Sequence, residues 1–152
     1  MSIISKADLQ TLIENLTHEV GIPLYIGSDF EFKDGHKPEA LKDNQIAVYI
    51  FYYPAGDIYL KIGKVGGNSN PRYLHQHYDP NSNGSTLAKS LCNDNSFYGQ
   101  FNKQNVGEWI RQNTKRLNIV FNCDDRSASS FRHVNSFIEA ALHFMLNPKY
   151  EK

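Results

Sequence analysis

The chain has 152 residues, 40% of them hydrophobic, which suits one domain with a single core and leaves no room for a second full domain. Sixteen Lys and Arg residues balance sixteen Asp and Glu residues. A net charge of zero argues, taken alone, against a protein that coats nucleic acid.

Targeting and cysteine signals point to an ordinary intracellular protein. The first residues, MSIISKADLQTLIENL, lack the charged and apolar regions of a signal peptide, and no stretch approaches the roughly 18 apolar residues of a membrane span. We therefore expect a cytoplasmic protein without a membrane partner. Cys92 and Cys123 form no CxxC pair, which disfavours a disulfide framework or a thiolate zinc site.

Charge is divided unevenly along the chain. Residues 1–46 hold four Lys and eight acidic residues, a net charge of −4, so residues 47–152 carry +4. The basic part could meet phosphate, and an ordinary solvated surface is the alternative.

Residues 1–45 are predicted to form a helical and loop extension to a domain that spans residues 46–152, in one compact unit. Ser5 and Asp8 resemble a capping box at a helix start. Apolar residues then recur at helical spacing until Gly21 and Pro23, namely Leu9, Leu12, Ile13, Leu16 and Val20.

Two strands of a hairpin are predicted at residues 46–53 and 57–65. Six of their aliphatic residues have even numbers, so one face of an antiparallel pair would carry both rows: Ile46, Val48, Ile50, Ile58, Leu60 and Ile62. A loop of residues 54–56, with Gly56 in the left-handed conformation, would keep this parity.

In that register Tyr49 lies opposite Lys61, on the face that the aliphatic residues leave free. An ammonium group beside a phenol favours the phenolate and lowers the tyrosine pKa, which prepares a base. The alternative is an amphipathic cross-strand pair on a solvated face.

The next segment, NSNPRYLHQHY, is predicted to start a helix, with Asn70 as N-cap and Pro71 at the first helical position. Arg72 then lies in the first turn, where it could grip phosphate. His75 would follow one turn later on a similar face, and His77 would point elsewhere.

Three more elements follow. GSTLAKSL is typical of a short helix that carries Lys89, and KRLNIVFN of a strand. The last helix is predicted from about Ser130 to Leu146, with Glu139 at the border of its apolar stripe. There Glu139 could bind a hard cation, pair with His143 around a transition metal, or lie on a plain solvated face.

Together these residues resemble the GIY-YIG nuclease family, over residues 46–148. Ala47-Val48-Tyr49 is similar to the first signature, and Lys61-Ile62-Gly63 to the second. Arg72 and the helix with Glu139 follow in the family's order. Tyr25-Ile26-Gly27 spells YIG but precedes the first signature and receives no role.

The resemblance implies an α+β fold in which helices flank a small three-stranded antiparallel sheet. It also implies metal-dependent hydrolysis of DNA phosphodiester bonds with Mg²⁺ or Mn²⁺. Tyr49 would be the general base, Lys61 would replace the second tyrosine and lower the Tyr49 pKa or hold the water, Arg72 would stabilise phosphate charge, and Glu139 would ligate the metal.

The chain departs from the family at two further points. Gln76 stands where the family has a histidine four residues after the arginine, so His75 is predicted as an auxiliary base or phosphate ligand. No asparagine matches the one that often follows the last proline.

DNA is the predicted partner, and the role is that of a restriction or repair enzyme. Lys64, Lys89, Arg111 and Lys115 are the predicted DNA contacts. A homodimer on a symmetric site is left open. The alternatives are a catalytically silent module that binds nucleic acid or protein, and an interaction protein that uses the acidic residues 1–46.

Overall fold

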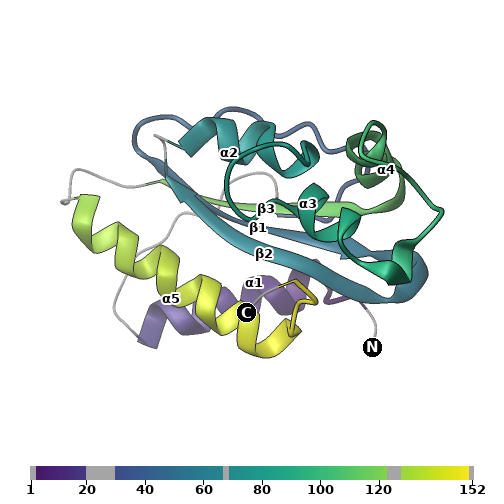
Figure 1. Ribbon diagram of the computed structural model, residues 1–152. Coiled ribbons are helices and arrows are strands. Elements are labelled where there is room, and N and C mark those ends of the chain that lie inside the picture. Colours follow the sequence, from purple (N-terminus) through teal and green to yellow (C-terminus); the bar gives the residue numbers. More distant parts are fainter. Residues whose placement is uncertain (1–2, 20–29, 67–68, 123–127, 151–152) are drawn as a thin grey trace.

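The computed structural model describes residues 3–19, 30–66, 69–122 and 128–150, with side chains from residue 132 onward in the last range (Figure 1). Val20, Gly21, Pro23, the Tyr25–Gly27 sequence and Cys123 therefore lie outside the described residues.

A three-stranded antiparallel sheet organises the fold, and its strand order is β2-β1-β3. The strands are β1 (Gln45–Tyr53), β2 (Ile58–Gly66) and β3 (Lys115–Asn122). Successive side chains of a strand point to opposite faces of the sheet. Because helices cover both faces, the apolar residues on each side of the strands are buried. The α+β prediction with this sheet is confirmed.

Helices cover both faces (Figure 1). One face packs against α1 (Lys6–Glu19) and α5 (Ala128–Leu146). The other packs against three shorter helices and the 3₁₀ turns between them: α2 (Asn70–Leu74), η3 (Gln76–Tyr78), α3 (Leu87–Cys92), η4 (Asn95–Phe97) and α4 (Val106–Asn113). None of the helices that the structure describes is both long and apolar enough to cross a membrane.

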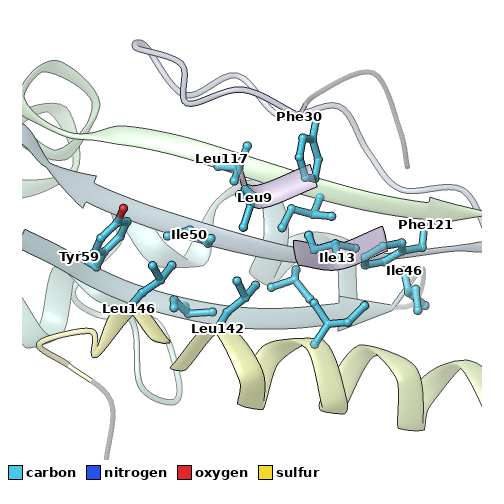
Figure 2. Close-up of a cluster of buried hydrophobic side chains, with 14 of the residues drawn as sticks. Leu9, Ile13, Phe30, Ile46, Ile50, Tyr59, Leu117, Phe121, Leu142 and Leu146 are labelled. Atoms are coloured by element: carbon cyan, nitrogen blue, oxygen red, sulfur yellow. The ribbon is translucent and has the colours of Figure 1, made fainter. Parts of the chain in front are cut away.

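The N-terminal helix belongs to the main core. As predicted, the Ser5 hydroxyl accepts a hydrogen bond from the Asp8 amide at 3.1 Å and donates one to its carboxylate at 2.6 Å. Leu9 and Ile13 are fully buried and meet the aliphatic side chains of β1 and α5, as Figure 2 shows. The extension thus contributes directly to the core beneath the sheet.

The predicted hairpin register is wrong by two residues. Tyr49 pairs with Gly63, and Lys61 pairs with Phe51. The connection is a 3₁₀ turn, η1 (Pro54–Gly56), and the left-handed residue is Asp57 at φ 48°, not Gly56. Asp tolerates this conformation well, and the longer connection shifts the strand pairing.

A bulge in β2 also splits the predicted aliphatic row. The pairing shifts between Phe51 and Tyr52, which leaves Leu60 as the extra residue of β2. Ile62 packs with the β1 aliphatics against α1 and α5, whereas Leu60 packs on the opposite face.

Candidate active site

Tyr49 lies at the centre of β1 and points toward the short helices α2 and α3. It is fully buried, so this face of the sheet is not the solvated face that the sequence left open. Its ring extends across Gly63 on the neighbouring strand, where a Cβ atom would overlap the Tyr49 hydroxyl. The glycine of the second signature therefore makes room for the tyrosine of the first.

His77 is the histidine that contacts Tyr49. Its Nε2 lies 2.6 Å from the Tyr49 hydroxyl oxygen, and its Nδ1 accepts a hydrogen bond from the Leu87 amide at 3.3 Å. A backbone amide can only donate, so Nδ1 carries no proton and Nε2–H donates to Tyr49. The surrounding fold fixes this tautomer.

The predicted placement of the two histidines is reversed. Helix α2 ends at Leu74, and the 3₁₀ turn η3 follows at once, which rotates His77 inward and leaves His75 exposed. N-capping also differs, because Ser69 is the cap residue and the Asn70 side chain instead holds both backbone groups of Leu41, at 2.7 and 2.9 Å.

Arg72 supplies the second donor to Tyr49. Its guanidinium group hydrogen-bonds the Tyr49 side chain. The Tyr49 oxygen thus accepts hydrogen bonds from His77 and Arg72, and the bond from Arg72 opposes the rise in the Tyr49 pKa that burial causes. Arg72 therefore lies beside the candidate base, and its predicted role at the phosphate stays a prediction.

Lys61 points to the same face as Tyr49 but is neither opposite it nor solvent-exposed. It is only 3% exposed, and its Nζ lies 3.5 Å from the Ser85 hydroxyl. Its charge helps to lower the pKa of His77. Lys61 thus belongs to the same cationic cluster as Arg72. It acts on His77, whereas the sequence predicted that it would act on Tyr49.

Opposing effects act on the pKa of Tyr49. Burial, the largest effect, raises the pKa, and the charge of Glu139 adds to the rise. The hydrogen bond from Arg72 and the charges of Arg72 and Arg116 lower it. The surrounding cations thus offset part of the burial penalty on a phenolate.

Glu139 lies on α5, which runs beside the edge strand β2 (Figure 1). Its carboxylate forms an ion pair with Lys64 at 2.6 Å and keeps a side-chain exposure of 21%. One turn earlier, Asn135 donates to the Val65 carbonyl at 3.3 Å, and within the described residues no group bonds its buried Oδ1.

This donor set suits a hard cation that keeps much of its water. No group of three or more His, Cys, Asp or Glu side chains is arranged for a metal within the described residues. Mg²⁺ commonly uses one or two carboxylates and takes its other ligands from water and phosphate. Glu139, partly exposed and near a second hard oxygen, fits that mode of binding.

The predicted DNA contacts have different surroundings. Lys89 is exposed, and Lys64 pairs with Glu139. Arg111 donates to the His36 carbonyl at 2.5 Å and stacks 3.7 Å above the Tyr78 ring, while Lys115 lies 3.8 Å from Asp34. Lys89 is thus the predicted contact best placed to meet a partner without rearrangement.

Two functional candidates escaped the sequence analysis. His77 was missed because the early end of α2 has no clear sequence signal. Arg116 was missed because the place of β3 beside β1 was not predicted. Alternation in KRLNIVFN does set Arg116 on the face opposite Leu117, and pairing with β1 then brings it to the Tyr49 side.

Acidification should destabilise the fold through two buried histidines. Burial lowers the pKa of His36 to about 4 and that of His77 to about 2. Both stay neutral when folded, so stability is retained above pH 6.5 and is lost as the pH falls toward these values, because the unfolded chain takes up protons first. Urea unfolding should give a free energy about 3–4 kcal/mol lower at pH 5 than at pH 7.

His36→Gln should reduce this pH dependence by about half, because it removes one of the two buried histidines. Equal unfolding free energies of the wild-type protein at the two pH values would contradict the neutral, buried state of both histidines.

Comparison with known proteins yields no relative: no family model, no curated protein and no solved structure matches this chain. Its function has to be inferred from the chemistry of the site.

Proposed function

We propose that this protein is a metal-dependent endonuclease of the GIY-YIG type, which hydrolyses DNA phosphodiester bonds. One observation carries the proposal: the Tyr49 hydroxyl, fitted over Gly63, accepts hydrogen bonds from His77 and Arg72 and lies within the field of Glu139. Gly63 and Arg72 are thus neighbours of Tyr49, and the charge of Glu139 acts on the same hydroxyl.

Tyr49 is the proposed general base. In its phenolate form it takes a proton from a water molecule, whose oxygen then attacks the phosphorus atom. His77 Nε2–H and Arg72 both donate to the Tyr49 oxygen and so stabilise the phenolate before the transfer. Neutral His77 keeps this donor role because its pKa is about 2.

The cations around Tyr49 are the proposed phosphate site. Lys61 and Arg72 lie on the same side of the sheet, and Lys89 is exposed on the neighbouring helix α3. Their charges complement a phosphodiester and the extra negative charge of its transition state. DNA is accordingly the proposed partner, in the cytoplasm, with restriction or repair as the proposed role.

Glu139 is the proposed metal ligand, with Asn135 Oδ1, four residues earlier on the same helix, as a further oxygen donor. When bound, Mg²⁺ or Mn²⁺ would supply Lewis-acid stabilisation of the leaving 3′ oxygen. Lys64 holds the carboxylate in the metal-free protein and would have to release it.

Glu139→Gln should lower the rate of plasmid cleavage at least about 100-fold and weaken Mn²⁺ binding, because an amide is a poor substitute for a carboxylate ligand. Glu39→Gln is the matched control, since Glu39 is exposed in a loop and should be dispensable. Mn²⁺ binding by calorimetry and cleavage with Mg²⁺ or EDTA measure both effects. Full, metal-dependent cleavage by Glu139→Gln would contradict the ligand role.

The Lys64–Glu139 ion pair favours a second candidate, a silent module that holds nucleic acid or protein without cutting it. The pair neutralises the carboxylate, and Tyr49 is fully buried. Such a module would bind DNA with a steep salt dependence, and no DNA form would be cleaved.

A further inference from the structure

Arg116 is a buried cation of unusual environment. Only 2% of the residue is exposed, and it is the largest of the fully buried side chains. Its Nε donates to Asn118 Oδ1 at 2.8 Å, Nη1 to the Tyr78 hydroxyl at 2.9 Å and Nη2 to the Tyr73 carbonyl at 2.8 Å. All three acceptors are neutral, and none of the described ion pairs includes Arg116.

A buried charge without a counter-ion is costly, so proteins retain one where it serves a purpose. Here the cost is reduced by the hydrogen bonds and by the faces of three aromatic rings. The guanidinium carbon lies 5.3 Å from the ring centre of Tyr49, 5.2 Å from that of Phe51 and 4.7 Å from that of Tyr73. The Tyr49 ring is thus one of the groups that surround the buried Arg116 charge.

Further contacts fix Arg116 in place. Its backbone pairs with Lys33 through two hydrogen bonds of 2.9 Å. Tyr78, which accepts from Arg116, lies 3.2 Å from His36 Nδ1, and His36 Nε2 lies 2.8 Å from the Thr114 carbonyl. Since that carbonyl can only accept, His36 Nε2–H donates to it and the Tyr78 hydroxyl donates to Nδ1.

Strand pairing places the Arg116 side chain on the same face of the sheet as Tyr49. Arg116 lies opposite Phe51 and Asn118 lies opposite Tyr49, so all four side chains share one face of the sheet. Loss of the Tyr49 proton would therefore create an anion beside a cation that has no other counter-ion among the described residues.

We propose that Arg116 is a positioning residue for Tyr49, a permanent buried counter-charge for the phenolate that the tyrosine forms. That the phenolate serves as a base rests on the proposed function, whereas the charge coupling does not. Other groups surround Tyr49: the charges of Arg72 on α2 and Glu139 on α5 act on it, neutral His77 on η3 contacts it, and Lys61 on β2 acts on His77. Arg116 differs from these groups because it is the cation on β3.

The coupling can be measured without DNA or metal. A fluorotyrosine at position 49 of the full chain gives a single ¹⁹F signal, and its more acidic phenol offsets part of the rise that burial causes in the Tyr49 pKa. Arg116→Met should raise the apparent pKa of this residue by at least about one unit, and Arg116→Lys should restore most of the wild-type value. Thermal melts of each variant report the fold separately.

A second variant covers the case in which Arg116→Met does not fold. Asn118→Asp is nearly isosteric, keeps Arg116, and places a carboxylate where the amide oxygen now lies 2.8 Å from Nε. Because the new carboxylate neutralises the guanidinium and itself lies opposite Tyr49, it should raise the apparent pKa by at least about one unit, so an unchanged value is the decisive outcome for this variant.

An unchanged titration in folded Arg116→Met, or in Asn118→Asp if the first variant fails to fold, would overturn the proposal and leave Arg116 with a structural role alone. A clear shift in a protein that cuts no DNA would sustain the charge coupling and refute the nuclease function instead. A failure of the charge coupling can thus be distinguished from a failure of the proposed nuclease function.

Discussion

Tyr49→Phe should lower the rate of DNA cleavage by about 10²- to 10⁴-fold, the usual contribution of a general base. Phe keeps the ring that packs beside Phe51 and Tyr73, so the fold should persist. It removes the oxygen with which both His77 and Arg72 interact. The buried His77 Nε2–H would lose its acceptor, which costs about 1–3 kcal/mol of stability.

Tyr53→Phe is the matched control, because Tyr53 lies on the same strand and packs its ring against Phe97 and Trp109. Single-turnover cleavage at 25 °C compares the two variants after urea unfolding has shown that both are folded. Equal rates for wild type and Tyr49→Phe would exclude Tyr49 as the base.

Gly63→Ala should damage the site without removing any of its functional groups. The added Cβ would overlap the Tyr49 hydroxyl, and both groups are confined between β1, β2 and the short helices. The Tyr49 ring must move away from His77 or the strands must separate. We expect a stability loss of about 1–3 kcal/mol, as for other overpacked cores, and a loss of cleavage comparable to that of Tyr49→Phe.

Gly66→Ala provides a stringent control on the same strand. A Cβ at Gly66 meets no atom within 4 Å, so this variant should retain both stability and activity. Urea unfolding and plasmid cleavage test the pair together. If Gly63→Ala behaved like Gly66→Ala in both assays, the close fit of Tyr49 over Gly63 would be wrong.

Local sequence rules predicted the elements well and their exact alignment poorly. The capping residues Ser5 and Asp8, the short helix that carries Lys89 and the alternation in β3 are short-range signals, and each appears in the structure. The hairpin register depends on which residue of the connection adopts the left-handed backbone conformation. Gly and Asp can both do so, and Asp57 takes that role where Gly56 was expected.

The chain order of the motifs predicted which residues to compare. The charges of Arg72 and Glu139 both act on Tyr49, and the roles that the resemblance implies for these three residues stay predictions. The inward position of His77 was not predictable, because tertiary packing ends α2 after five residues and a 3₁₀ turn follows. Arg116 depends on sheet order, which alternation within one strand does not reveal.

The measurement that tests the central claim most directly is cleavage of supercoiled plasmid by the wild-type protein with Mg²⁺ or with EDTA, beside Tyr49→Phe. We predict nicking or linearisation by the wild type with Mg²⁺ alone, and none above background by the variant. If the folded wild type cut neither duplex nor branched nor single-stranded DNA with Mg²⁺ or Mn²⁺, the nuclease proposal would be contradicted and the silent binding module favoured.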